Sequence, residues 1–226
     1  MIEIKDLCKN YGKGFKLEVS TEFANGKIHV LAGKNGAGKS TLLKCIAGLE
    51  EYTGSILICG YPNKSIEGKS KIAYCPEVPE VMDYISVYEH IKFISFAYDV
   101  INWEEKADDL IRIFNLESYK NKLGRELSKG TKQKVSICNA LIRSDALIIL
   151  DEPFVGLDPF SIQELKKCIL KKIEQDNCTF ILSTHVLESV NDLWDTVYIM
   201  NNGRIVNISH RNEKDTLLNI FMGNSK

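Results

Sequence analysis

The chain has 226 residues, enough to bury a full core as one domain or as one domain with an inserted subdomain. Its 29 lysines and arginines nearly balance its 30 aspartates and glutamates, which argues against a protein drawn by net charge to nucleic acid or to an anionic membrane. Seven scattered cysteines without C-x-x-C spacing suit reduced thiols in a cytosolic protein rather than a cysteine metal site, and no apolar run approaches the roughly 20 residues of a membrane span.

The first third of the chain, to about residue 74, is mainly strand-like. Apolar residues alternate with polar ones at Ile2 and Ile4 and again at Ile56 and Ile58, as expected for strands with one buried face. A helix-type run interrupts this pattern and ends at Gly48. This part of the chain should carry a sheet.

The middle of the chain, from about residue 76 to 144, has helical periodicity. Apolar residues share one face at spacings of four, three, one and three, namely Trp103, Ala107, Leu110, Ile111 and Phe114. A helical insert is the simplest interpretation.

The last third returns to strands. Ala146 to Leu150 and Thr179 to Leu182 are continuous apolar runs typical of buried parallel strands, and a helix from about Pro159 to Gln175 separates them. Near the end, Asn202-Gly203 predicts a tight hairpin turn between two further strands.

Residues 33 to 40 read GKNGAGKS, a match to the phosphate-binding loop G-x-x-x-x-G-K-[ST] between a strand-type and a helix-type run. Glycines let the backbone turn tightly and approach an oxyanion, the Lys39 ammonium suits the β and γ phosphates, and Ser40 can ligate magnesium. A turn that binds nothing is the alternative. The loop predicts a nucleoside triphosphate ligand held by Gly33, Asn35, Gly36, Ala37, Gly38, Lys39, Ser40 and Thr41.

Two acids end the strand-type run in ALIILDEP, residues 146 to 153. At the carboxyl end of a buried strand, Asp151 would hold the magnesium shell together with Ser40. Glu152 would orient and deprotonate the attacking water. The alternative is a strand that ends in solvated acids.

The order of the motifs resembles the nucleotide-binding subunit of ATP-binding cassette (ABC) transporters over nearly the whole chain. After the phosphate loop come LSKGTKQ (127–133), DEP (151–153), Gly156-Leu157-Asp158 and Ser183-Thr184-His185. The resemblance implies an α/β fold: a P-loop NTPase core with a parallel sheet, an N-terminal antiparallel β subdomain and an inserted α-helical subdomain. Residues 1–76 and 145–226 would form the core with the β subdomain, and about 77–144 the helical subdomain.

The resemblance also implies roles for residues outside the phosphate loop. Ser128, Lys129 and Gly130 would contact ATP held by a second subunit, although Lys129 and Thr131 depart from the usual LSGGQ in a way that looks like an export branch. The remaining roles are Tyr11 against adenine, His185 near the γ phosphate as a catalytic residue, and Asp158 in the dimer loop. Simpler interpretations are a helix N-cap for Ser128, a packed turn tyrosine, a strand-end histidine and a turn aspartate.

Glu77 stands where the family more often has glutamine, in a loop that touches magnesium and the lytic water. An ionised glutamate only accepts hydrogen bonds, and it is a harder magnesium ligand that an unshielded γ phosphate would repel. The resemblance therefore makes Glu77 a catalytic and metal residue. The apolar residues after it match a groove for a helix of the membrane subunit, or else pack the core: Val78, Val81, Met82, Tyr84 and Tyr88.

The resemblance implies an ATPase, with ATP and Mg²⁺, that powers export through a separate transmembrane permease. Two such subunits, as a homodimer or heterodimer, would close on ATP at the cytoplasmic face of the membrane, and no nucleic acid is expected. The alternatives are an importer subunit, a soluble ABC-type ATPase acting on ribosomes or DNA, and a nucleotide-binding regulator without turnover.

Overall fold

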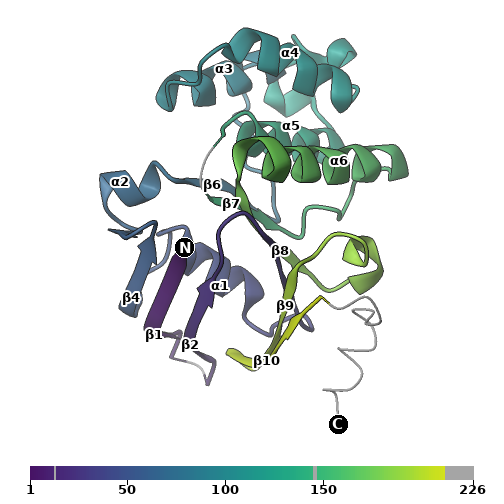
Figure 1. Ribbon diagram of the computed structural model, residues 1–226. Helices are drawn as coiled ribbons and strands as arrows, with labels where there is room; N and C mark the ends of the chain where they lie inside the picture. The colour runs from purple at the N-terminus through teal and green to yellow at the C-terminus, as the bar shows by residue number, and fades with distance from the viewer. Residues whose placement is uncertain (13, 145–146, 212–226) are drawn as a thin grey trace.

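The computed structural model describes residues 1–12, 14–144 and 147–211 and contains two sheets with helices around them (Figure 1). The strand order is β2-β1-β4-β5 in the smaller sheet and β10-β9-β3-β8-β7-β6 in the larger. The predicted α/β fold is confirmed. Within the described ranges, no helix combines the length and apolar character needed to cross a membrane.

The smaller sheet is antiparallel and N-terminal, as predicted. Alternation along β1 and β4 buries Ile2, Ile4, Ile56 and Ile58 on one face, where each is at most 2% exposed. Its strands are β1 (Ile2–Asn10), β2 (Lys16–Phe23), β4 (Thr53–Ile58) and the short β5 (Tyr61–Pro62).

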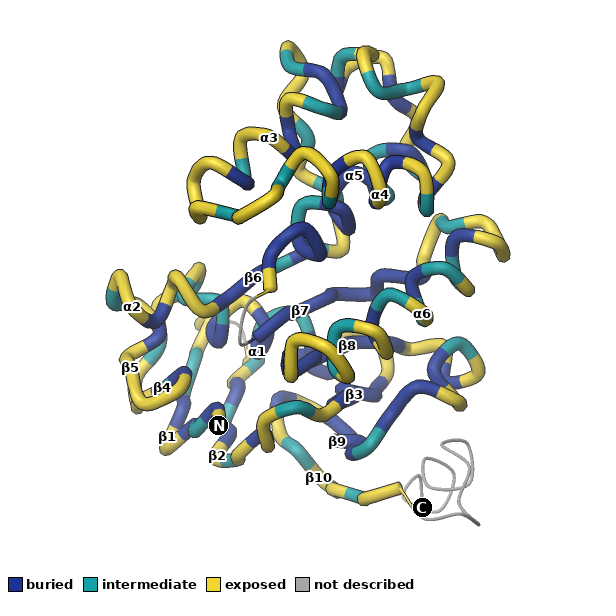
Figure 2. The backbone as a smooth tube through the Cα atoms, turned by 45° about the horizontal axis from the view of Figure 1, so that its top comes forward, coloured by how far each residue is buried: buried dark blue, intermediate teal, exposed yellow. Residues whose placement is uncertain are grey.

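The larger sheet is parallel except for its edge strand β10. Its strands are β3 (Ile28–Ala32), β6 (Ile72–Cys75), β7 (Leu147–Asp151), β8 (Thr179–Thr184), β9 (Thr196–Asn201) and β10 (Arg204–His210). Every residue of β3, β7 and β8 is buried, and all three lie inside the molecule in Figure 2. Because these three strands run parallel to one another, their carboxyl ends meet at one edge of the sheet. Ala146, predicted as the first strand residue before Leu147, lies outside the described residues.

Helices fill the space between the sheets and cover the other face of the larger one. Leu42, Leu43 and Ile46 of α1 share a buried cluster with both sheets. At one end of the molecule, the helices α3 and α4 form a helical unit that stands away from the smaller sheet (Figure 1). The helices are α1 (Lys39–Ile46), α2 (Ile66–Lys69), α3 (Val87–Ala97), α4 (Trp103–Ile113), α5 (Lys129–Leu141) and α6 (Pro159–Asp176), with 3-10 turns η1 (Glu117–Tyr119), η2 (Gly124–Glu126) and η3 (Leu187–Val190).

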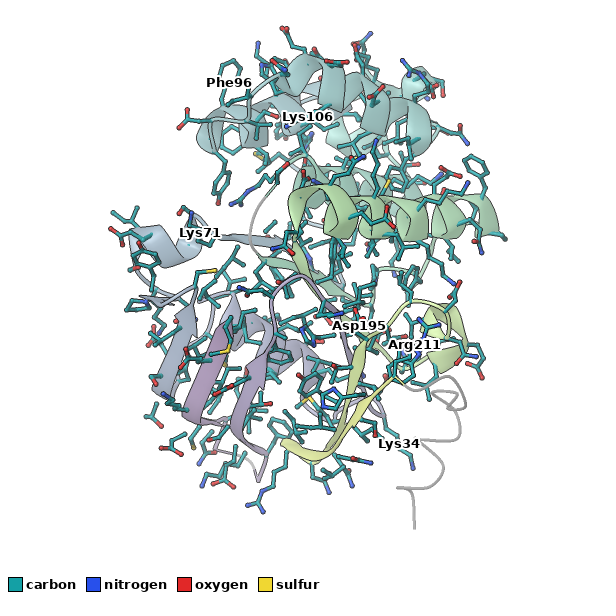
Figure 3. All side chains as sticks on the ribbon, viewed as in Figure 1. Lys34, Lys71, Phe96, Lys106, Asp195 and Arg211 are labelled. Carbon is teal, nitrogen blue, oxygen red and sulfur yellow. The ribbon has the colours of Figure 1, made fainter. Side chains whose placement is uncertain are left out.

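The end of the hairpin β9–β10 is tied back to the middle of the larger sheet. Asp195 and Arg211 lie close together in Figure 3, and the Arg211 backbone N–H donates to the Asp195 carbonyl at 2.9 Å. The Asp195 carboxylate accepts from the backbone N–H of Ile28, the first residue of β3, at 2.8 Å. The edge hairpin is thus fastened to the strand that leads into the phosphate loop.

The predicted hairpin turn is confirmed, and it braces that loop. Asn202 and Gly203 have φ of 47° and 76°, the left-handed values that a tight hairpin needs. The Gly203 N–H donates to the Ala37 carbonyl at 2.9 Å, and its carbonyl accepts from the Glu18 N–H at 2.8 Å. One turn therefore ties β2 to the phosphate loop.

Replacing Gly203 by Ala should be more destabilising than replacing Gly60 by Ala. Both have positive φ, but a Cβ on Gly203 would lie 2.0 Å from the Lys16 carbonyl oxygen, whereas a Cβ on Gly60 meets nothing within 4 Å. The backbone clash should lower the free energy of unfolding by about 1–3 kcal/mol beyond the loss in the Gly60 variant. Urea denaturation measures the difference, and equal losses would contradict a tight packing role for the turn.

Candidate active site

The phosphate loop runs from the end of β3 to Lys39, the first residue of α1. Gly36 and Gly38 have φ of 81° and 104°, which glycine adopts without strain. Gly33 is constrained differently, because a Cβ there would lie 2.6 Å from the Met200 carbonyl oxygen. Among the described residues, no side chain caps the start of α1. Its first N–H groups can therefore bind an anion.

Lys39 is buried with its ammonium inside the loop. Its Nζ donates to the Gly33 carbonyl at 2.9 Å and lies 3.5 Å from Oε1 of Glu152. Both side chains are 6% exposed. A buried cation beside backbone carbonyls and one carboxylate is well placed to bind phosphate oxygens.

Asp151 is at the bottom of the site, where three elements meet. Its Oδ1 accepts from Ser40 Oγ at 3.1 Å and also from Ser183 Oγ, while the Glu152 N–H donates to Ser183 Oγ at 2.8 Å. The register of β7 and β8 places Asp151 opposite Ser183. Burial raises the pKa of the Asp151 carboxyl above its usual range, although the two serine hydroxyls oppose this shift. Serine and carboxylate oxygens are donors of the kind that magnesium prefers.

Glu152 and His185 form a pair beside Lys39. His185 Nδ1 lies 2.9 Å from Glu152 Oε2, and the His185 backbone N–H donates to the same oxygen at 3.4 Å. Glu152 has φ of 48°, an uncommon conformation for a residue with a side chain. The carboxylate is thus held between an ammonium and an imidazole.

Lys39, Ser40, Glu152 and His185 line one cavity of about 470 Å³, whereas Asp151 lines the neighbouring cavity described below. The lining of the 470 Å³ cavity is Phe15, Asn35, Gly36, Gly38, Lys39, Ser40, Thr41, Glu77, Glu152 and His185. Glu77 is exposed and reaches this cavity from the loop after β6. Phe15 was not predicted. The alternation of β2, which begins one residue later, could have indicated it, since Phe15 and Leu17 fall on the same face.

Tyr11 lies outside the residues that line this cavity. Its side chain is 48% exposed, and its ring centroid is 6.4 Å from that of Phe15. A direct contact of Tyr11 with adenine stays a prediction.

The LSKGTKQ segment also lies away from the cavity. Ser128 is the N-cap of α5 and accepts from the Thr131 N–H at 3.2 Å, while Lys129 is exposed. A Cβ on Gly130 would lie 2.9 Å from the Gly156 carbonyl oxygen, so the segment packs closely on the loop after Glu152. The N-cap role does not conflict with contact to a nucleotide held by another subunit, which stays a prediction.

Asp158 is fixed within its own chain. It caps α6 through the Ser161 N–H at 2.9 Å, and Lys134 Nζ lies 2.8 Å from its Oδ2. The hydrogen bond from Lys134, followed by those from Ser161, holds the pKa of Asp158 well below its usual range. A role of Asp158 at the interface between two subunits stays a prediction.

A second cavity of about 770 Å³ lies next to the first, with Ser40 and Glu77 lining both. The apolar residues after Glu77 were predicted either to form a groove for a helix of the membrane subunit or to pack the core, and each interpretation fits some of them. Val78 and Tyr84 are 70% and 77% exposed, whereas Val81 and Tyr88 pack against the core. Val78 lines this cavity, and an exposed apolar side chain at a groove suits a partner surface.

Comparisons with known proteins agree with this geometry. A family model described as ABC transporter matches residues 17–155. The SkfA peptide export ATP-binding protein SkfE of Bacillus subtilis (strain 168) is 35% identical over 213 residues, covering 91% of this chain and 87% of that protein. The Methionine import ATP-binding protein MetN of Clostridioides difficile (strain 630) is 33% identical over 240 residues, covering 100% and 72%.

A solved structure described as the ATP-binding subunit of an ABC transporter superimposes with a TM-score of 0.92 at 31% identity, covering all of both chains. The fold, the phosphate loop and the paired acids thus occur together in a chain that matches the family over most of its length. This protein belongs to the ABC transporter family, as an ATP-binding subunit that hydrolyses ATP.

Proposed function

We propose that this subunit powers export of a substrate through a separate transmembrane permease. The Glu152–His185 pair beside Lys39 and Ser40 carries the proposal, because one cavity holds both the phosphate-binding groups and a carboxylate that can activate water. The hydrogen bond from Ser40 to Asp151 links this cavity to its neighbour. The name of SkfE supports export, as do Glu77 and Lys129, which look like the export branch.

In the proposed hydrolysis, the γ phosphate binds Lys39 and the loop amides. The Lys39 ammonium and the Glu152 carboxylate lie 3.5 Å apart. The phosphate would take the place of this carboxylate as the partner of the ammonium. Glu152, still oriented by His185, accepts a proton from water while the water oxygen attacks phosphorus. The bond to the β-phosphate oxygen breaks, which gives ADP and inorganic phosphate.

Ser40 and Asp151 fit a magnesium ion, with Glu77 as a further oxygen donor. No group of three His, Cys, Asp or Glu that could hold a metal occurs in the described part of the chain. Phosphate oxygens would complete the ligand set, as is usual where Mg²⁺ is held by one or two carboxylates. When bound, the ion would neutralise charge that develops on the phosphates.

Two subunits would close on two ATP molecules. The phosphate loop of one would hold each ATP, and Ser128, Lys129 and Gly130 of the other would cover it with the N-terminus of α5. Asp158 would lie at the interface. Tyr11 would contribute a ring near the base. The pair is a homodimer or a heterodimer with a second nucleotide-binding subunit.

The permease would dock at the cavity of 770 Å³, which lies between the core and the helical unit. Val78, Tyr98 and Leu49 line it and are more than 40% exposed. We propose that residues 1–76 and 145–226 are the core with its β subdomain, and about 77–144 the helical subdomain. The complex would be peripheral on the cytoplasmic face of the membrane. Import remains the second candidate, which the MetN relative favours.

Glu152→Gln should slow ATP hydrolysis by roughly 10² to 10⁴, because the amide cannot accept the proton from water. ATP binding should persist, and an ATP-dependent dimer should accumulate. Phosphate release and size-exclusion chromatography with and without ATP measure the two effects. Hydrolysis at the normal rate would remove Glu152 from its proposed role.

Glu77→Gln should weaken the dependence of ATP hydrolysis on magnesium concentration. A carboxylate is a better magnesium ligand than an amide, and the γ phosphate repels it when no cation intervenes. Titrating Mg²⁺ at saturating ATP tests this, with Glu80→Gln as the matched control because Glu80 lines only the neighbouring cavity. An unchanged magnesium profile would contradict a metal role for Glu77.

A membrane protein should copurify with the tagged subunit from detergent-solubilised cells. Val78→Asp should reduce its recovery, since Val78 is exposed at the groove, while Val206→Asp, exposed on the edge strand β10, should not. With ATP sealed inside, vesicles that contain the recovered complex should expel rather than accumulate its substrate. Uptake would favour the importer, and copurification with ribosomes would overturn the transport proposal.

A further inference from the structure

Ser128 and Thr131 form a pair of hydroxyl groups at the start of α5. Their side-chain oxygens lie 2.9 Å apart, and the Thr131 backbone N–H donates to Ser128 Oγ at 3.2 Å. Ser128 is exposed at the N-cap, whereas Thr131, at the third helical position, is only 9% exposed. In the part of the chain that the structure describes, Ser128 is the one hydrogen-bond partner of the Thr131 hydroxyl. An exposed hydroxyl is thus supported by a buried one.

Position 131 is also a place where this chain departs from the LSGGQ pattern. A glutamine three residues after an N-cap serine can reach back to the backbone N–H of that serine, as in a capping box. The shorter threonine side chain contacts the serine hydroxyl instead. The threonine therefore changes what the serine oxygen bonds to, while the N-cap itself is kept.

The first turn of α5 holds both residues in place. The Lys132 backbone N–H donates to the Ser128 carbonyl at 2.9 Å. Gly130, between the two hydroxyl residues, packs closely on the Gly156 carbonyl. A β-branched threonine has few χ1 conformations in a helix. The Thr131 hydroxyl therefore has a defined position before any ligand arrives.

The protons of this pair decide whether Ser128 can donate to a ligand. A hydroxyl has one proton to donate and two lone pairs that accept, and one lone pair of Ser128 Oγ already accepts from the Thr131 N–H. If Ser128 gave its proton to Thr131, none would be left for a ligand. If Thr131 donates instead, the Ser128 O–H can point outward. The oxygens of a fully ionised phosphate only accept, so phosphate binding requires the second arrangement.

We propose that Thr131 is a positioning residue that donates its proton to Ser128 Oγ and so directs the Ser128 O–H to the phosphates of the ATP held by the opposite subunit. The proposal rests on the proposed covering of that ATP by the Ser128 segment. Accepting two hydrogen bonds also polarises the Ser128 hydroxyl, which strengthens its own donation. Thr131 acts through Ser128 and does not touch the nucleotide.

The test uses Glu152→Gln subunits, together with any second nucleotide-binding subunit that copurifies, so that the ATP-bound pair accumulates. Thr131→Val removes the hydroxyl but keeps the shape of the side chain and the backbone N–H that bonds to Ser128. The dissociation constant of the pair, measured by analytical ultracentrifugation with ATP, should rise about threefold to tenfold for each Thr131 hydroxyl removed. Thr131→Ser, which keeps the hydroxyl, should retain the parent value.

Ser128→Gly is the matched reference, because glycine is nearly as good an N-cap as serine but has no hydroxyl. It should weaken the pair by itself, and adding Thr131→Val to it should have no further effect. ATP binding to the unpaired subunit and the thermal unfolding temperature should stay at the parent values in Thr131→Val, since Thr131 does not line the phosphate-loop cavity. A loss of either would mark a structural role and overturn the proposal.

Two further results would overturn the role of Thr131 alone. One is an unchanged pair in Thr131→Val when Ser128→Gly weakens it, which would leave the covering by Ser128 in place. The other is a further loss when Thr131→Val is added to Ser128→Gly, since Thr131 would then act by another route. If Ser128→Gly left the pair unchanged, the proposed covering would itself be wrong, and the inference with it.

Discussion

The parallel pairing of β3, β8 and β7 is the constraint on which the site depends. Side by side in register, these strands end at the same edge, and each delivers different chemistry there: the glycine loop after Ala32, Asp151 and Glu152 from β7, and His185 after β8. A shift of one residue would turn every side chain of a strand to the other face. Complete burial of all three strands makes such a shift costly, so the core and the catalytic geometry are determined together.

Burial also shapes the electrostatics of the cavity. Lys39 and Glu152 are both almost fully buried, and each has a partner: loop carbonyls for the ammonium and His185 for the carboxylate. A buried charge is tolerated only when it is paired and hydrogen-bonded. The charges of the site are therefore paired in the chain itself, and a phosphate would exchange partners with groups that are already oriented.

The sequence predicted most of the fold and the centre of the site, because those features follow local rules. The glycine pattern before Lys39 and the apolar run before Asp151 each specify a strand end without knowledge of the rest of the chain. What could not be predicted depends on contacts between distant segments. The hairpin turn at Gly203 braces the phosphate loop from more than 160 residues away, and Phe15 enters the cavity only because β2 packs beside that turn. The separation of exposed Val78 from packed Val81 likewise depends on tertiary packing.

The close contact between Gly130 and the Gly156 carbonyl has a consequence for a pair of subunits. Gly156 belongs to the loop that follows Glu152, the proposed hydrolytic acid of its own site, while Gly130 belongs to the segment proposed to cover the ATP of the opposite site. The two backbones touch with no room for even a methyl group between them. A displacement of one of these backbone segments would therefore move the other, so the proposed cover of one site is mechanically coupled to the loop of the other site.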